Sequence, residues 1–135
     1  MHNITHRLLG MVGATVLLVW ATHAAYAQDA VKVDPQHYKV ESENAQVRVL
    51  RITYGPHEKS VMHEHPASVA VFLTDGQAKF TLPNGKTEEQ SWKAGQTLLL
   101  PAGKHLPESM SDKSFELLLV ELKGKPAKTT LPKTK

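Results

Sequence analysis

Short runs of alternating hydrophobic and polar residues follow one another along the central part of the chain. The clearest run, at 46–54, is rich in β-branched residues and ends at Gly55-Pro56. Further short runs, one mostly polar at 87–92 and two strongly apolar at 97–100 and 115–122, predict strands at 60–65, 68–74, 77–82, 87–92, 97–100, 105–110 and 115–122, with an irregular return as the alternative at 105–110. Turn signals such as Asp75-Gly76 and Asn84-Gly85 separate the runs, and no stretch has a convincing helical period. We therefore expect an all-β fold, a small antiparallel barrel or sandwich.

The N-terminal segment has a different pattern. A single basic residue, Arg7, precedes an uncharged and mostly apolar run at 8–20, and an Ala-x-Ala site follows at 25–27. This order predicts a secretory signal peptide at 1–27, so we expect a periplasmic or secreted protein. An uncleaved membrane anchor is the alternative, because the uncharged stretch is long enough to span a bilayer. Its glycines and polar residues favour cleavage.

The rest of the chain divides by patterning and charge. We expect an N-terminal lead-in with one short strand at 28–45, one barrel domain at 46–122, and a disordered tail rich in lysine and proline at 123–135. The tail carries five lysines and no acid, whereas residues 28–122 carry ten Lys or Arg against thirteen Asp or Glu. The domain is therefore slightly acidic, and neither nucleic-acid binding nor stable membrane insertion after cleavage is expected.

Histidines are the candidate chemical groups. The chain has no cysteine, which excludes disulfides, thiolate metal sites and a cysteine nucleophile. His63 and His65 are one residue apart on a predicted strand, so their side chains share a face, while Glu64 turns away from it. His105 lies forty positions after His65. If the fold brings all three together, neutral imidazoles can hold one divalent metal ion such as Fe, Ni, Cu, Mn or Zn.

The region around the paired histidines resembles the first of two motifs that characterise the cupin superfamily. That family motif is Gly, five residues, His-x-His, three or four residues, Glu, six residues and Gly. Here Gly55 is followed by seven residues, His63-Glu64-His65, three residues, Val69, six residues and Gly76. The spacing is similar, but a valine replaces the carboxylate.

The second family motif is Gly, five residues, Pro-x-Gly, two residues, His, three residues and Asn. Here Gly95 is followed by five residues, Pro101-Ala102-Gly103, one residue, His105 and, four positions on, Ser109. The resemblance covers residues 46–122 and implies a cupin-like jelly-roll barrel with metal ligands at His63, His65 and His105.

The valine at the usual carboxylate position leaves three alternatives for the metal site. Three histidines can form a facial site with open positions for water or substrate, as in some cupin dioxygenases that this arrangement resembles. Another group, His57 or Glu108, can be recruited as a further ligand. In the third alternative, metal binding is weak or lost, because isopropyl offers no donor atom.

The resemblance also implies a range of functions. It points to a dioxygenase or isomerase that acts on a small organic molecule, with the catalytic residues unknown. The alternatives are a non-catalytic periplasmic module that binds a small ligand or metal, and a metal-free barrel that forms a homodimer through an outer sheet face. If Val69 occupies the position of the family ligand, Val69, Val71 and Leu73 face the interior and Ala70 and Phe72 face outward. An apolar pocket of this kind is consistent with an aromatic or small acid substrate.

Overall fold

The computed structural model describes residues 28–124. The predicted signal peptide and the tail from 125 onward lie outside the described residues. The described chain forms one short helix and nine strands: α1 (Ala30–Val33), β1 (Tyr38–Glu43), β2 (Val47–Tyr54), β3 (His63–His65), β4 (Ser68–Phe72), β5 (Gly76–Thr81), β6 (Thr87–Trp92), β7 (Thr97–Leu100), β8 (Gly103–Ser109) and β9 (Phe115–Leu122). No helix within 28–124 is long and apolar enough to cross a membrane.

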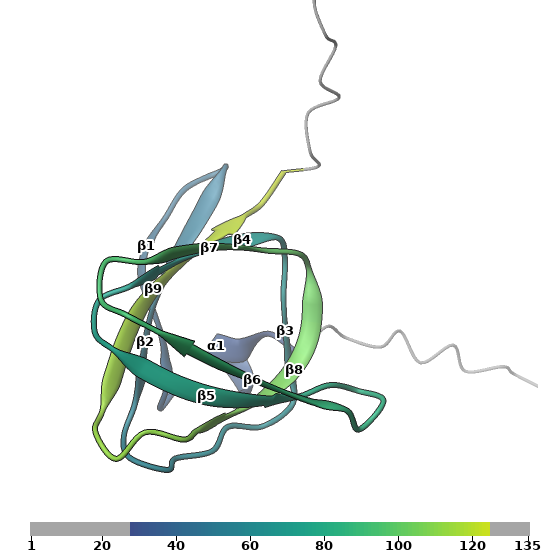
Figure 1. Ribbon diagram of the computed structural model, residues 1–135. Coiled ribbons are helices and arrows are strands. Elements are labelled where there is room, and N and C mark those ends of the chain that lie inside the picture. Colours follow the sequence, from purple (N-terminus) through teal and green to yellow (C-terminus); the bar gives the residue numbers. More distant parts are fainter. Residues whose placement is uncertain (1–27, 125–135) are drawn as a thin grey trace, which may run out of the picture.

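The strands form two facing sheets that close into a barrel (Figure 1). One sheet has the order β1-β2-β9-β4-β7 and the other has the order β3-β8-β5-β6. Neighbouring strands pair in antiparallel fashion throughout. The all-β, antiparallel jelly-roll expectation is therefore confirmed. Side chains from both sheets, including Leu50, Phe72, Trp92 and Leu119, form the buried core between them.

The lead-in is more ordered than its weak patterning indicated. Its helix α1 was not expected, because a four-residue turn is too short to show a period. The Asp29 carboxylate caps this helix by accepting a hydrogen bond from the Val31 N–H at 3.0 Å. Residues 28–29 then run beside the edge strand β3, where the Glu64 N–H donates to the Gln28 carbonyl at 2.8 Å. Figure 1 shows α1 through the opening of the barrel, near β3.

The segment at 68–74 has the opposite orientation to the one expected. Three of its residues were expected in the barrel interior: Val69, Val71 and Leu73. They lie instead on the outer face, partly exposed, while Ala70 and Phe72 are buried in the core. The chain leaves one sheet after His65 and enters the other at Ser68, so the strand alternation does not continue across the two residues between them.

Two glycines explain local features of the fold. Gly85 has a φ of 81°, which the tight turn between β5 and β6 requires and which glycine adopts without strain. Gly76 lets the indole of Trp92 pack directly on the backbone, since an added Cβ would lie 2.6 Å from a ring carbon. The Trp92 ring also stacks on Phe72 at a centroid distance of 4.6 Å, which fixes one wall of the core.

Candidate metal centre

Three histidines meet on the inner face of the smaller sheet. His63 and His65 come from β3, and His105 lies directly opposite His63 on β8. One ring nitrogen from each lies within 4.8 Å of those of the other two. The ring centroids are 4.8–5.4 Å apart, and the rings face one another edge to face. The structure thus brings together the three histidines that the sequence singled out.

Hydrogen bonds fix which nitrogen His63 and His65 offer. Nδ1 of His63 lies 2.8 Å from the Val61 carbonyl oxygen, which can only accept, so this nitrogen carries the proton. Nε2 of His63 is therefore a lone-pair acceptor, and it is fully buried without any hydrogen-bond partner among residues 28–124. A buried polar atom without a partner is costly unless something else binds it. A divalent cation held by three nitrogens fits this position.

Burial keeps two of these imidazoles neutral. It lowers the pKa of His63 to about 4, with the neighbouring His65 contributing in the same direction. Burial likewise lowers the pKa of His105 to about 3, aided by His63 and His65. A neutral imidazole is the form that binds metal, so at neutral pH a cation has no proton to displace from either ring.

A buried carboxylate supports the third histidine. Nδ1 of His65 donates to Glu121 at 2.6 Å, and Arg48 donates to the other oxygen of Glu121, also at 2.6 Å. Asp29 accepts a further hydrogen bond from Arg48 at 2.7 Å and completes this hydrogen-bond network. Burial on its own would raise the pKa of Glu121, but the hydrogen bonds from His65 and Arg48 hold that pKa below its usual value. Glu121 is therefore ionised. Because it binds the Nδ1 proton of His65, the Nε2 atom of His65 has a free lone pair that can bind a metal.

Sequence reasoning missed Glu121, although the sequence carries a signal for it. In the run 115–122 the residues Phe115, Leu117 and Leu119 point into the core. Glu121 shares their alternation and is 1% exposed, so a charged residue occupies a core position at the end of an apolar strand. Glu121 also lies opposite Ser68 in the strand register. Its side chain is on the inner face of the sheet, whereas Val69 is on the outer face.

The other sequence candidates lie in different surroundings. His57 is exposed and pairs with Asp112 at 2.8 Å. Glu108 pairs with Lys79 at 2.9 Å. Neither belongs to the group of converging histidines. Glu64 turns away from its histidine neighbours and faces Lys104 at 3.6 Å, as the alternation predicted.

A second polar cluster, also not foreseen from the sequence, lies behind His63. His37 contacts the Asp34 carboxylate through Nδ1 at 2.7 Å, and Ser60 donates to the same carboxylate oxygen. The Ser60 hydroxyl is also 3.5 Å from Nδ1 of His63. His37, Asp34 and Ser60 are all buried, so this network fixes the segment that leads into β3.

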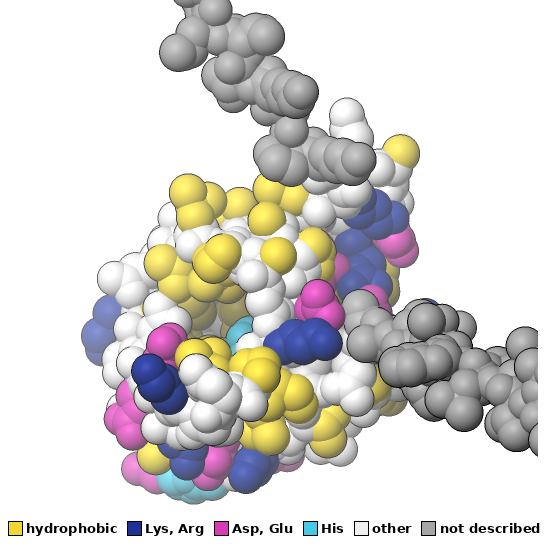
Figure 2. All heavy atoms as spheres, turned by 90° about the vertical axis from the view of Figure 1, so that its right-hand side faces the viewer, with side chains coloured by type: hydrophobic (Ala, Val, Ile, Leu, Met, Phe, Trp, Pro, Cys, Tyr) yellow, Lys and Arg dark blue, Asp and Glu magenta, His cyan; other side chains and the backbone are white. Residues whose placement is uncertain are grey.

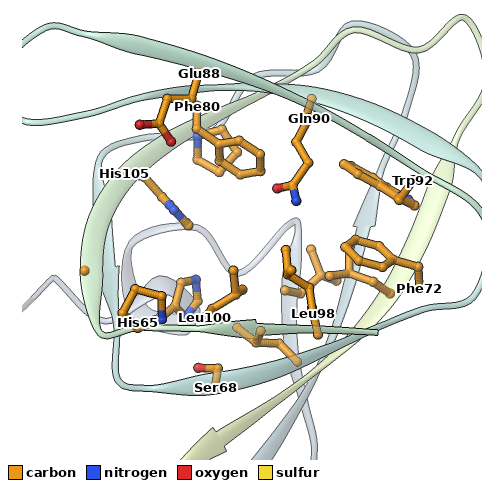
Figure 3. Close-up of a pocket in the computed structure, with 18 of the residues that line it drawn as sticks. His65, Ser68, Phe72, Phe80, Glu88, Gln90, Trp92, Leu98, Leu100 and His105 are labelled. Atoms are coloured by element: carbon orange, nitrogen blue, oxygen red, sulfur yellow. The ribbon is translucent and has the colours of Figure 1, made fainter. Parts of the chain in front are cut away.

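A cavity of about 270 Å³ opens beside the histidines inside the barrel. His65 and His105 form part of its wall, and most of the remaining wall is apolar and aromatic (Figure 3). Figure 2 shows its mouth as a hollow framed by hydrophobic side chains, with a histidine visible inside. A small molecule in this cavity would contact both the candidate metal site and the apolar core.

The fold is similar to that of several solved cupin structures. The chain matches no protein-family profile and no curated protein. A cupin domain from Bordetella pertussis is 25% identical, with a TM-score of 0.60, over 64% of this chain and 92% of that one. A double-stranded β-helix protein from Klebsiella pneumoniae is 21% identical, with a TM-score of 0.52, over 65% and 76% of the two chains. An RmlC-like cupin from Methanocaldococcus jannaschii shares the fold at 18% identity, with a TM-score of 0.51 over 66% and 83%.

Proposed function

The chain is a protein of the cupin superfamily, and on this premise we propose that it binds one divalent metal ion through His63, His65 and His105. The observation that carries the proposal is the Nε2 atom of His63, which is buried without a partner and lies beside nitrogens of the other two rings. All three donors are imidazoles, which suit Fe, Ni, Cu or Zn. When bound, the ion would supply Lewis-acid chemistry, and redox chemistry if it is a redox-active metal.

The residues around the site have separate tasks in this proposal. Glu121 orients His65, and Arg48 pairs with both Glu121 and Asp29, so no carboxylate enters the converging group of histidines itself. A ligand that supplies an anionic donor atom is therefore favoured at the open positions. The apolar cavity holds the body of that ligand and keeps water away from it.

The same cavity favours dioxygenase over isomerase chemistry within this proposal. An isomerase needs a general acid or base in contact with its substrate. Tyr38 and Tyr54 are among the residues that line the cavity, but their hydroxyls hydrogen-bond to each other at 2.8 Å, and burial raises the pKa of both. Glu88 is the one carboxylate among the described residues that line the cavity, and it is exposed to solvent. Chemistry that depends chiefly on the metal needs no such group.

Metal content is the direct test of this function. We would purify the untagged protein and a His63→Ala/His65→Ala/His105→Ala variant and measure bound metals by elemental mass spectrometry. Near-stoichiometric metal in the wild type alone is expected, and the metal found then defines an oxygen-uptake screen with small organic molecules. Metal and ligand binding without turnover would assign a non-catalytic binding module. No metal in the wild type, even after Fe, Ni, Cu, Mn or Zn is added, would contradict the proposal.

We also propose that the protein is exported. The proposal rests on the order of a basic residue, an apolar run and an Ala-x-Ala site in the first 27 residues. Intact mass analysis of the protein from a periplasmic fraction should give a chain that begins at Gln28. A chain that retains the apolar run in the membrane fraction would favour the anchor alternative.

A further inference from the structure

We infer that Gln90 selects ligands with an uncharged hydrogen-bonding group at the end away from the metal, and that the cavity rejects a carboxylate at that end. This inference rests on the proposed metal site and defines the class of molecule that the site accepts. It concerns strand β6, the edge strand of the smaller sheet farthest in strand order from the ligand strand β3.

Gln90 presents a free amide to the cavity. Glu88, Gln90 and Trp92 alternate along β6 and line the cavity, while Glu89 between them does not. Figure 3 shows the Gln90 amide pointing into the cavity between Phe80 and Trp92, across from His65. Within residues 28–124 this amide has no hydrogen-bond partner in the protein. The amide is only partly buried, so it is available to a polar group of a ligand that enters the cavity.

The charges around the cavity disfavour an anion at this end. Lys104 is the one cationic side chain among the described cavity-lining residues, and it faces Glu64 at 3.6 Å. Glu88 is two positions from Gln90 on the same face of β6, but Figure 3 shows its carboxylate pointing away from Gln90, toward the side of His105. A ligand carboxylate beside Gln90 could accept one hydrogen bond from the amide, but it would lose its hydration and gain no cation. A neutral amide or hydroxyl group would form the same hydrogen bond at a much smaller desolvation cost.

The size of the cavity limits the ligand further. An apolar cavity of about 150 Å³ is enough to hold benzene in another protein. At about 270 Å³, this cavity has room for one ring with a metal-binding group and one small substituent. We therefore assign the ligand to compact, flat, mostly apolar molecules with a metal-binding end and a neutral polar end. A small organic acid fits this class only if its acidic group is the one that binds the metal.

A matched set of three compounds tests this assignment. Benzohydroxamic acid binds metals through its hydroxamate, and its para position can carry a carboxamide, a carboxylate or a methyl group. We would titrate each compound into the zinc-loaded full chain by calorimetry, because zinc has no redox chemistry of its own. The carboxamide should bind at least tenfold more tightly than the carboxylate and about fivefold more tightly than the methyl compound.

Two variants separate the contributions of the two side chains. Gln90→Leu should reduce the carboxamide to the affinity of the methyl compound and leave the methyl compound itself unchanged. Glu88→Gln should leave the preference for the carboxamide over the carboxylate in place, because the Glu88 carboxylate points away from Gln90. Glu89→Gln, on the opposite face of the same strand, is the matched control and should change none of the three affinities.

The outcomes distinguish this inference from the function on which it rests. If zinc does not bind, the proposed metal site is contradicted and the inference fails with it. If zinc binds but the carboxamide and carboxylate bind equally, or none of the compounds binds, the inference alone is contradicted. The comparison within the wild type does not depend on whether either variant folds.

Discussion

Nδ1 of His65 donates a hydrogen bond of 2.6 Å to Glu121. This bond joins β3, which carries two candidate ligands, to β9 at the centre of the opposite sheet. The family motif that the sequence resembles has a carboxylate where this chain has Val69. In the structure the carboxylate of Glu121 is not one of the candidate ligands but hydrogen-bonds to one of them, where it orients the imidazole of His65.

Replacing Glu121 with glutamine should weaken metal binding by about 10- to 100-fold, the usual effect of losing an outer carboxylate partner. The shape of the side chain is retained, but the charge that holds the Nδ1 proton of His65 is lost. Competition with a colorimetric zinc chelator would measure the change. Glu116→Gln is the control, because Glu116 lies on the outer face of the same strand. An unchanged zinc affinity in Glu121→Gln would show that the contact is only structural.

Replacing Arg48 with methionine should lower the free energy of unfolding at pH 7 by about 1–3 kcal/mol, because the buried Glu121 carboxylate loses its cation. The pKa of Glu121 is lowered in the folded state, so its favourable contribution is present above its ordinary value of 4.5 and is lost on acidification. The difference between variant and wild type should therefore shrink at pH 3.5. Urea unfolding at both pH values measures it.

Arg51 provides the comparison for this experiment. It lies in the same strand and contacts Glu41 and Glu116, but these groups are about one third or more exposed. Solvent screening limits such pairs to less than about 1 kcal/mol. If Arg51→Met lowered the free energy of unfolding as much as Arg48→Met does, a special role for the buried Arg48–Glu121 pair would be contradicted.

The metal-free protein should lose stability in mild acid. The pKa of His63 is about 4 and that of His105 is about 3 when folded, against 6.5 for a free histidine. The unfolded chain therefore binds more protons below pH 6.5, and unfolding becomes easier by up to about 1.4 kcal/mol per pH unit for each ring. Urea unfolding in the presence of a chelator between pH 7.5 and 5 would show this slope. His105→Phe should have a shallower slope, and an identical slope would contradict the assignment.

Gly76→Ala should destabilise the fold by about 1–3 kcal/mol, because the new methyl group would lie 2.6 Å from the indole of Trp92. Gly103→Ala is the matched control, since a Cβ there meets no atom within 4 Å. Thermal unfolding of both variants, followed by tryptophan fluorescence, would compare them. Equal melting temperatures would show that the Trp92 ring can move aside without cost.

Local sequence patterns predicted most of the strands and the shared face of His63 and His65. The His-x-His spacing requires only that 63–65 is extended, and strand alternation then places both rings on one face. The place of His105 beside them was expected from the second motif of the family resemblance, and in the structure it comes from the pairing of His105 with His63. The strands and the shared face of His63 and His65 depend on neighbouring residues, so a single sequence is sufficient to predict them.

Other features depend on how distant segments meet. The inward orientation of Ala70 could not be derived from the pattern, because it depends on the chain changing sheets at 66–67. The contact of Glu121 with His65 joins residues 56 positions apart. A charged residue at a core position of 115–122 indicates that a partner exists, but only the fold identifies that partner.

The bond between the Gln28 carbonyl and the Glu64 N–H has a consequence for maturation. If the leader is removed after residue 27, the first residue of the processed protein is the one that covers the open edge of β3. The processed protein then has no residue on the N-terminal side of the one that pairs with β3. A cut only two positions further along would remove Asp29 as well, and with it the cap of α1 and the outer partner of Arg48. The accuracy of signal-peptide removal would thus decide whether the candidate ligand strand is properly enclosed.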